Sequence, residues 1–545
     1  MEERLRTKIF GWLLVGATLC GPAAAQEASA GQNCEKLAKL RLPKVQITSA
    51  QMVAAGAFTP PEALSPWLRG DAALYKELPP FCRVRAVARP SADSEVKIEV
   101  WLPASGWNGK FQGQGNGGFA GEIAYRLLGL AISDGYATAG TDTGHAGSGT
   151  DAKWALGHRE KVVDFGYRAI HEMTQVGRAV TQAFFGERPR HSYFASCSNG
   201  GRQALMEAQR FPADYDGIMA GAPANFWSHL LASALYGIQA TTLNPASYIP
   251  DNKLPAIAAA VNAACDAQDG VVDGILNDPR QCHFDPSSLV CQSGDSDKCL
   301  TSAQAKALKK LYEGAHDSQG KEIYPGLLPG AELGDGGWKP WITGEAPGKS
   351  LMFDFGNGYF ANMVYGKANW DYKTADFDRA VKKADSKTAG ILNATDPNLK
   401  RFQARGGKLI IYHGWDDPAI SALNSINYYQ EVVGTMGQPA VDSFARLYMV
   451  PGMQHCFQGP GTDSFGQPGT TVPKDPEHDL QLALEQWVEK GVAPGVIVAT
   501  RHVDDDAAKG VQMTRPLCPY PQEAKYKGSG DTKQAESFGC VAGGK

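Results

Sequence analysis

Ser198 lies where a strand-like run meets a helix-forming one, and its hydroxyl could act as a nucleophile if a base lay beside it. The apolar run Tyr193-Phe194-Ala195 precedes it, and Gly200 and Gly201 come directly behind it. This order is typical of the sharp turn called a nucleophile elbow, although the common motif reads G-x-S-x-G and here Ser196 takes the first position. Read in isolation, Ser198 would be better interpreted as the cap of the following helix.

Candidates for the base and the acid follow later strand-like runs. His455 comes after the run RLYMV, and the adjacent Asp416 and Asp417 come after KLIIY. The order serine, acid, histidine is that of hydrolases built on an α/β sheet, in which the three loops meet at one edge. His413 also ends a strand, but it precedes the acid on the same loop. Spacing does not choose between Asp416 and Asp417, and both could be turn formers before a proline.

Such a triad would form an acyl-enzyme and would need two backbone N–H groups to stabilise the oxyanion. The N–H of Asn199, directly after the serine, is one candidate. The other is in the glycine-rich loop GNGGFAG, at Gly117 or Gly118, because this loop follows an early strand-like run. We select Gly118, while the ordinary alternative for the loop is a flexible turn.

The cysteines predict disulfide bonds that bear on this site. The chain has 11 cysteines, and an even number remains when Cys20, in the N-terminal run, is set aside, as expected for an oxidising compartment. Proximity suggests the pairs Cys265–Cys282, Cys291–Cys299 and Cys518–Cys540, and Cys34 could pair with Cys82. The remaining two, Cys197 and Cys456, directly adjoin the predicted nucleophile and base. We therefore expect a bond that ties the two loops together; the alternative is that Cys197 is itself the nucleophile.

The N-terminus has the pattern of a secretory signal peptide. Basic residues precede the apolar run IFGWLLVGATLCG, and the small-residue sequence PAAAQ follows, which predicts cleavage after Ala25. Lipidation at Cys20 is not expected, because Leu19 before it is too large. We therefore predict a secreted or periplasmic protein.

Composition excludes several classes of partner. The 545 residues carry a formal net charge of −4, and 43 % are hydrophobic, with a pI of about 6.3 and a mean hydropathy of −0.29. A chain so nearly balanced in charge gives no indication of a nucleic acid partner. No long apolar segment follows the N-terminus, so we expect no membrane span. The expected partner is a small molecule, and no feature indicates an oligomeric state.

The predicted elements alternate between strands and helices from about residue 95, which indicates a parallel sheet with helices on its faces. Between residues 225 and 406 the alternation stops, and it returns afterwards with strand-to-loop segments and an amphipathic helix. We therefore predict an α/β-hydrolase fold with a large inserted lid. The predicted divisions are 1–25 for the signal peptide, 26–225 and 406–545 for the two parts of the sheet domain, and 226–405 for the lid.

A second motif, CDAQDGVVDGILNDPRQC, lies inside the predicted lid. Asp266, Asp269 and Asp273 recur within it, and glycines follow two of them. Carboxylates so close together repel one another unless they are solvated or bound to a hard cation. The spacing is not that of an EF-hand, and a solvated turn is the ordinary alternative, but enclosure by two cysteines favours a calcium loop.

Four motifs resemble one family. C-S-N-G-G, YDGIMAGAPANFW, YHGWDD and QHC are similar to motifs of the tannase and feruloyl esterase family, which includes hydrolases of mono(2-hydroxyethyl) terephthalate. The resemblance covers most of the mature chain. It implies that Asp417, the last residue of H-G-x-x-D, is the acid of a triad with Ser198 and His455. It also implies a structural calcium ion remote from the ester, with Val271 and Ile275 adding carbonyl oxygens to the three aspartates.

The resemblance implies a serine carboxylesterase for esters of aromatic acids. Aromatic residues of the predicted lid could stack on the substrate, although most are expected to be core: Trp227, Trp338, Trp341, Phe353, Phe355, Tyr359 and Phe360. The terephthalate branch is expected to hold a free carboxylate with a lid arginine, yet no arginine lies between Arg280 and Arg379. Lys339 or Lys349 could replace it only as a point charge. Phenolic esters, such as feruloyl, chlorogenate or galloyl esters, are therefore favoured over terephthalate monoesters. A non-catalytic binding protein on a hydrolase scaffold is the remaining alternative.

Overall fold

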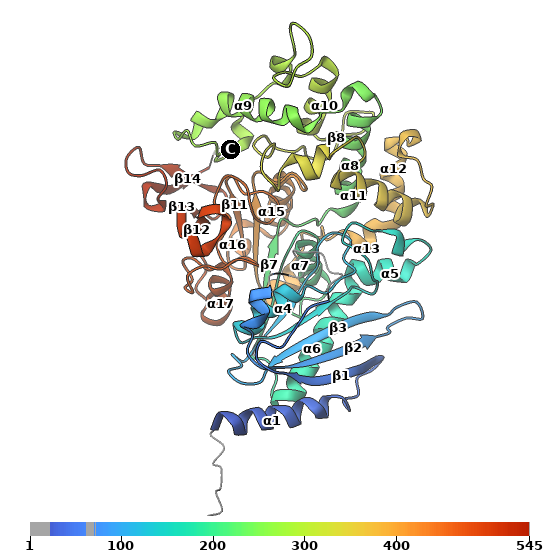
Figure 1. The fold of residues 1–545 in the computed structure, drawn as a ribbon, viewed down its shortest axis with the longest axis vertical. Coiled ribbons are helices and arrows are strands. Elements are labelled where there is room, and N and C mark those ends of the chain that lie inside the picture. Colours follow the sequence, from blue (N-terminus) through green and yellow to red (C-terminus); the bar gives the residue numbers. More distant parts are fainter. Residues whose placement is uncertain (1–21, 62–69, 71, 544–545) are drawn as a thin grey trace, which may run out of the picture.

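The computed structural model describes residues 22–61, 70 and 72–543 (Figure 1). Most of the predicted signal peptide, residues 1–21, lies outside the described residues. The first described element, helix α1 (Pro22–Leu37), includes the predicted cleavage point after Ala25. The signal peptide therefore stays a prediction.

A mixed sheet of nine strands forms the base of the described part of the chain, in the order β1-β2-β3-β5-β4-β6-β7-β10-β11. The strands are β1 (Val45–Val53), β2 (Phe81–Ala88), β3 (Val96–Pro103), β4 (Lys110–Gln114), β5 (Ala137–Thr141), β6 (His191–Cys197), β7 (Gly217–Gly221), β10 (Lys408–Gly414) and β11 (Ala445–Val450). Antiparallel pairing joins β1 to β2, β2 to β3 and β3 to β5, and all later neighbours are parallel. The predicted α/β-hydrolase fold is confirmed.

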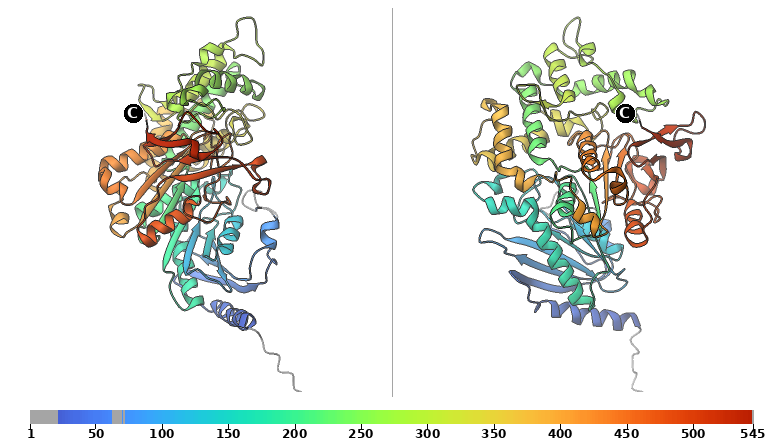
Figure 2. Two further views of the ribbon diagram at one scale, coloured as in Figure 1. Left: turned by 90° about the vertical axis from the view of Figure 1, so that its left-hand side faces the viewer. Right: turned by 180° about the vertical axis from the view of Figure 1, so that it is seen from behind.

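The central strands are short and apolar because helices cover both faces of the sheet. Strands β6, β7, β10 and β11 are buried almost throughout. One face packs against α1, α6 (Ala169–Phe185), α7 (Asn199–Arg210) and α15 (Ala422–Met436). The other packs against α4 (Tyr125–Ser133) and α17 (Leu480–Lys490) (Figure 2). Three short helices complete the sheet domain: α3 (Ala72–Lys76), α5 (Arg159–Val163) and α16 (Gln438–Asp442).

Between β7 and β10 the chain adds no strand to this sheet and forms a separate helical layer, green to orange in Figure 1. Its elements are α8 (Trp227–Thr242), α9 (Leu254–Cys265), α10 (Ser302–Glu313), β8 (Ala315–His316), β9 (Glu322–Tyr324), α11 (Leu351–Tyr359), α12 (Phe377–Ala384), α13 (Gly390–Leu392) and α14 (Lys400–Ala404). One apolar cluster lies within this layer, and another joins the layer to residues of the sheet domain such as Phe119 and Phe165. Leu399 and Phe402 already pack in the core of the sheet domain, so the chain returns to that core just before residue 405, the predicted end of the lid.

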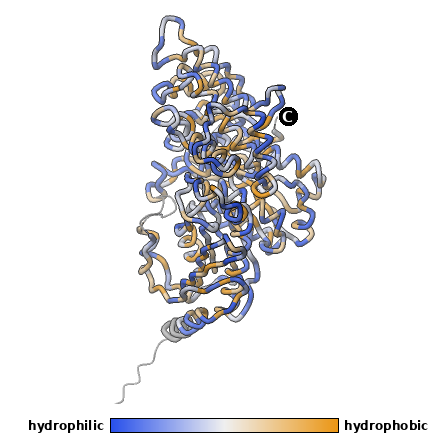
Figure 3. Tube along the Cα trace, turned by 90° about the vertical axis from the view of Figure 1, so that its right-hand side faces the viewer, coloured by the Kyte–Doolittle hydropathy of each residue, from blue (hydrophilic) through white to orange (hydrophobic). Residues whose placement is uncertain are grey.

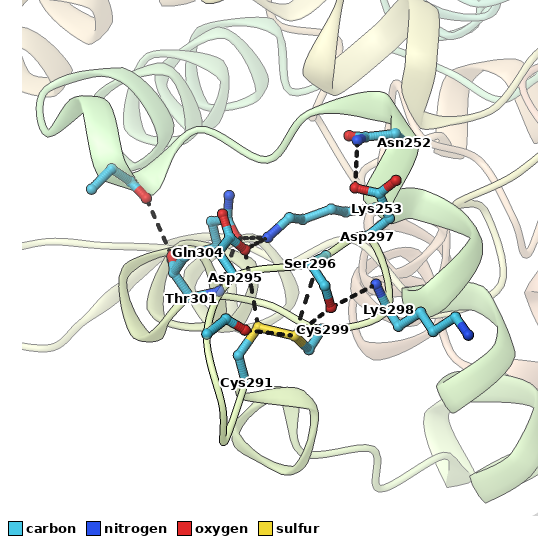
Figure 4. Close-up of polar contacts among 12 residues, drawn as sticks. Asn252, Lys253, Cys291, Asp295, Ser296, Asp297, Lys298, Cys299, Thr301 and Gln304 are labelled. Carbon is cyan, nitrogen blue, oxygen red and sulfur yellow. Dashed lines mark hydrogen bonds and ion pairs between the residues drawn. A yellow bond between two sulfur atoms is a disulfide. The ribbon is translucent and has the colours of Figure 1, made fainter.

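All five predicted disulfide bonds are present in the structure. Two of them close loops of the lid, and Figure 4 shows the shorter, Cys291–Cys299. The loop between these cysteines is held to the neighbouring helix start by polar contacts. Lys253 pairs with Asp295 and also donates to Gln304 Oε1. The disulfide and the buried lysine together fix this outer corner of the lid.

The C-terminal segment forms two hairpins beside the lid. They consist of β12 (Ile497–His502), β13 (Val511–Leu517), β14 (Gln522–Tyr526) and β15 (Phe538–Ala542). The Cys518–Cys540 bond ties the second hairpin to the end of the first. Polar and apolar segments alternate along the whole trace (Figure 3). Among the described helices, none combines the length and the apolarity that crossing a membrane requires.

Candidate active site

Ser198 occupies the turn between β6 and α7, as the sequence predicts. Its backbone has φ 68° and ψ −125°, a conformation that is rare for a residue with a side chain and is stored at functional turns. The turn is tight enough to exclude side chains behind the serine. A Cβ atom added to Gly200 would lie 1.9 Å from Ser196 Oγ, and one added to Gly201 would lie 2.2 Å from the carbonyl oxygen of Gly221.

Ser198, His455 and Asp417 form one hydrogen-bonded chain. Nε2 of His455 lies 2.9 Å from Ser198 Oγ, and its Nδ1 lies 2.7 Å from Asp417 Oδ2. Because a carboxylate only accepts, Nδ1 carries the proton, and the neutral ring accepts the serine hydroxyl through Nε2. The three side chains come from the loops after β6, β10 and β11, which the parallel sheet brings to one edge.

Asp417 is buried and accepts four hydrogen bonds. Besides His455, its Oδ2 accepts from Nε2 of His413 at 3.1 Å, while Oδ1 accepts the backbone N–H groups of Ala419 and Ile420 at 2.8 and 2.9 Å. Burial alone would raise the pKa of Asp417, but His455 and His413 hold it well below its usual range. The carboxylate is therefore charged and fixed in place.

His413 is a member of the site that sequence reasoning did not include. Its Nε2 lies 3.1 Å from both Asp417 Oδ2 and the carbonyl oxygen of Ile420, so this nitrogen carries a proton. Its Nδ1 lies 2.7 Å from Ser425 Oγ. The sequence could have indicated this role, because the motif H-G-x-x-D places His413 four residues before Asp417 on the same loop.

The carboxyl group of Asp416, the other candidate acid, is buried without a hydrogen-bond partner among the described residues. Burial first, and Glu332 of the lid second, raise the pKa of Asp416 well above its usual range. A neutral carboxyl group in this position cannot balance the charge of an imidazolium. The geometry therefore separates the two adjacent aspartates, which spacing does not.

The Cys197–Cys456 bond joins the residues that flank the serine and the histidine. The Cα atoms of the two cysteines lie 6.0 Å apart, and 259 positions separate them in the sequence. Cys197 therefore has no free thiol beside Ser198. Because each cysteine adjoins a member of the hydrogen-bonded chain, the bond fixes the distance between the two loops.

The residues predicted to bind the oxyanion lie beside the serine. Asn199 begins α7, so its N–H has no acceptor inside the helix. Gly118 has φ 53°, and a Cβ atom added there would lie 2.2 Å from the carbonyl oxygen of Gly149, so only glycine fits. Both residues line the same cavity as Ser198.

That cavity has a volume of about 540 Å³ and opens over Ser198 and His455. Of the seven predicted lid aromatics, Trp227, Trp341 and Phe355 line it. The ring of Trp341 meets that of His455 edge-on at 5.0 Å and stacks on Phe355 at 6.1 Å. Trp338, Tyr359 and Phe360 are buried core, and Phe353 packs on Tyr372.

The two predicted lysines do not line the cavity. Lys339 pairs with Asp251 at 3.0 Å, and neither it nor Lys349 is among the lining residues. The cations that do line it, Arg126 and Lys310, were not selected from the sequence. Neither belongs to a motif, so only the fold could reveal them.

The acidic loop of the lid directs its carboxylates to backbone amides. Each accepts an N–H from within the loop: Gly274 for Asp266 (3.0 Å), Val271 for Asp269 (2.9 Å) and Ile275 for Asp273 (3.1 Å). Burial first, and the charges of the other two aspartates second, raise the pKa of Asp269 to about 6. Burial also raises the pKa of Asp273, although Arg515 lies 2.7 Å away.

Three carboxylates and nearby carbonyl groups are the oxygen ligands that a calcium ion takes. Among the described residues, however, the groups whose ligand atoms lie within 4.8 Å of one another are two others: His171, Glu207 and Asp214, and Asp475, Glu477 and His478. Asp266 and Asp273 are close enough to raise the pKa of Asp269, but the three carboxylates would have to turn inward to share an ion.

Fold and site together define an α/β-hydrolase whose serine, histidine and acid meet under an inserted lid. The family model for tannase and feruloyl esterase matches residues 82–541. The chain is 43 % identical to an uncharacterized esterase of Xanthomonas campestris over 94 % of this chain and 92 % of that one. It is 33 % identical to a probable feruloyl esterase B-1 of Aspergillus fumigatus over 98 % and 99 % of the two chains.

Solved structures agree with these relatives. The crystal structure of feruloyl esterase B from Aspergillus oryzae matches with a TM-score of 0.85 at 30 % identity, covering 94 % of this chain and all of that one. Tannin acyl hydrolase from Aspergillus niger shares the fold, with a TM-score of 0.72 at 24 % identity over 94 % of both chains. The protein belongs to the tannase and feruloyl esterase family and is a carboxylic ester hydrolase.

Proposed function

We propose that the protein hydrolyses esters of phenolic acids, such as feruloyl, chlorogenate or galloyl esters, with Ser198, His455 and Asp417 as its catalytic triad. The observation that carries the proposal is the hydrogen-bonded chain of these three residues at the floor of a cavity with aromatic walls. A planar aromatic acyl group fits between such walls better than a flexible aliphatic chain does.

The reaction follows from the tautomer of His455. Nε2 takes the proton of Ser198 Oγ as the oxygen attacks the ester carbonyl, and Asp417 stabilises the imidazolium that forms. The N–H groups of Gly118 and Asn199 bind the oxyanion. His455 then returns the proton to the leaving alcohol, and water releases the acid from the acyl-enzyme by the same steps.

Two alternatives are weaker. A terephthalate monoester would place a free carboxylate among the lid residues, where Leu231, Leu351 and Met352 line the cavity and the exposed Lys310 is the only cation that the lid contributes. A binding protein on an inactive scaffold would need no aligned serine and histidine. The alignment of all three side chains favours catalysis.

We also propose that the loop with Asp266, Asp269 and Asp273 binds a structural calcium ion, with carbonyl oxygens from Val271 and Ile275. The raised pKa of Asp269 supports this, because a cation would stabilise the charged form that burial and the neighbouring carboxylates disfavour. The loop lies beside the C-terminal hairpins through Arg515. The ion would therefore brace the lid and take no part in ester chemistry.

Export is part of the proposal. Five disulfide bonds indicate an oxidising compartment. Together with the signal-like N-terminus, they support a secreted or periplasmic enzyme.

The test is hydrolysis of a panel of galloyl, feruloyl, caffeoylquinate and terephthalate monoesters by the wild type and Ser198→Ala. We expect phenolic esters to be preferred and the variant to lose turnover by on the order of a million-fold. Thermal melting of the variant checks that it folds. Wild-type turnover in the variant would remove Ser198 from the mechanism.

A further inference from the structure

Two chemically different sets of residues line the cavity over Ser198. Those of the lid are largely apolar and aromatic, and include Trp341, Phe355 and Met352. Those of the sheet domain include the polar side chains of Arg126, Ser148 and Thr150. Since an aromatic acyl group suits the lid residues, the polar residues are available for the alcohol part of the ester.

Arg126 has no carboxylate partner among the described residues. Its one hydrogen bond there runs from Nη2 to the carbonyl oxygen of Gly469 at 2.6 Å, although a guanidinium has five N–H groups. The side chain is half-buried, and burial lowers the pKa of Arg126. A charge in this situation lacks the compensation that buried cations ordinarily have.

Other partly buried arginines of this chain have carboxylate partners or several hydrogen-bond acceptors. Four are paired with carboxylates: Arg83 with Glu99, Arg168 with Asp164, Arg280 with Asp278, and Arg515 with Asp273. Arg202, which is fully buried, donates instead to one side chain and three carbonyl groups. Arg126 differs from all of them because it lines the cavity over Ser198 with one hydrogen bond and no carboxylate partner among the described residues.

Arg126 lines the same cavity as Ser198 and the oxyanion loop. That loop packs on the segment 148–150, since the N–H of Phe119 donates to the carbonyl oxygen of Gly149 at 2.7 Å. Gly118, Ser148 and Thr150 line the cavity as well. The sheet-domain part of the cavity lining therefore offers a substrate two hydroxyl groups and one guanidinium.

We propose that Arg126 binds a carboxylate on the alcohol part of the substrate, so that the preferred esters join an aromatic acid to a hydroxylated carboxylic acid. This assignment rests on the proposed esterase function and deepens it. The planar guanidinium suits a carboxylate, because two N–H groups can bind its two oxygens. The neighbouring hydroxyls of Ser148 and Thr150 suit the hydroxyl groups of such an alcohol.

The test is a matched pair of substrates: 3-caffeoylquinate and its methyl ester, in which the carboxylate is masked. We expect the wild type to prefer the free acid in kcat/KM by on the order of tenfold or more, as for a charge-assisted pair. Arg126→Met should bring the ratio of the two kcat/KM values close to one. Arg126→Lys should give an intermediate ratio, because charge remains without the planar fork.

The ratio is the readout because any general loss of activity affects both substrates and cancels. Lys310→Met, which removes a lysine that the lid contributes to the cavity lining, should retain the wild-type ratio. Added salt should lower the wild-type preference, since the site is partly exposed. A wild-type ratio near one, or an unchanged ratio in Arg126→Met, would overturn the assignment and leave the esterase function standing. Failure of the wild type on both substrates, with hydrolysis of feruloyl or galloyl esters, would likewise overturn the assignment alone, whereas failure on every phenolic ester of the panel would overturn both.

Discussion

Two loops of this protein use aspartates in opposite ways. In the loop after β10, four hydrogen bonds converge on Asp417, and its pKa is held low. In the loop after α9, Asp269 accepts only backbone amides, and burial with neighbouring carboxylates raises its pKa to about 6. In the first loop, residues of the chain itself stabilise the charged carboxylate. In the second loop, burial and the neighbouring carboxylates disfavour the charged form of Asp269. This difference is the basis for proposing a role in catalysis for the first loop and a role in binding a cation for the second.

In this comparison of the two loops, the largest effect should come from changing Asp417. Asp417→Asn would place an amide N–H₂ where two histidine N–H groups now donate, so His455 would lose the tautomer that accepts the serine proton. We expect kcat to fall by roughly ten-thousand-fold, as in the Ser-His-Asp template. Steady-state kinetics on the preferred phenolic ester would measure it.

The neighbouring residue supplies a matched control. Asp416→Asn replaces a neutral, buried carboxyl group with an amide of the same shape, so kcat should stay near the wild-type value. If the two variants lost activity equally, the distinction between the adjacent aspartates would be wrong.

A smaller effect should follow from removing the Cys197–Cys456 bond. Replacing both cysteines with alanine leaves the triad in the chain but frees the two loops, and small misplacements of catalytic groups can cost roughly a hundredfold in rate. Closing so long a segment stabilises the fold by roughly 5 kcal/mol in the chain-entropy model. We therefore expect slower turnover and a lower melting temperature, measured on the same preparation.

The lid disulfide Cys291–Cys299 provides the comparison. It closes a separation of only 8 positions, so its double alanine variant should lose less stability and retain the wild-type rate. Equal loss of rate in both double variants would mean that the bond beside the site has no special positioning role.

The sequence was sufficient for those parts of the site that depend on chain order. Ser198, the two aspartates and His455 could be placed at the ends of strands, and the disulfide partners of the flanking cysteines followed once the loops were expected to meet. The structure bears out the fold and all five pairings. Local pattern and strand order were enough because parallel strands bring their ends to one edge.

Other features depend on packing between distant segments and left no local signal. Asp416 and Asp417 differ because Glu332 of the lid lies near the first and two histidines bind the second. Arg126 lies on α4 outside any motif, and only the folded chain brings it to the cavity lining. Side chains whose role comes from burial cannot be distinguished by spacing alone.

The smallest expected effect is on stability, and it tests the loop that contains Asp266, Asp269 and Asp273. In chelator the folded loop holds the pKa of Asp269 at about 6, above its ordinary 3.8. Between these values the unfolded chain ionises while the folded loop keeps its proton, so stability is lost as pH rises through this window. Asp417 has the opposite sign: its depressed pKa contributes stability above its ordinary pKa, which is lost as pH falls.

We therefore expect the melting temperature in chelator to be lower than in calcium, with the difference growing as pH rises from about 4 to about 6. Asp269→Asn should abolish that growth, because the amide does not titrate, whereas the exposed Gln268→Ala in the same loop should preserve it. Other carboxyl groups titrate in this range, so the informative quantity is the difference between the calcium and chelator curves within each variant. If those curves ran parallel in the wild type, and metal analysis of protein purified without chelator found no calcium, the aspartates would be a turn held by backbone amides. The contrast between the two loops would then concern hydrogen bonding alone.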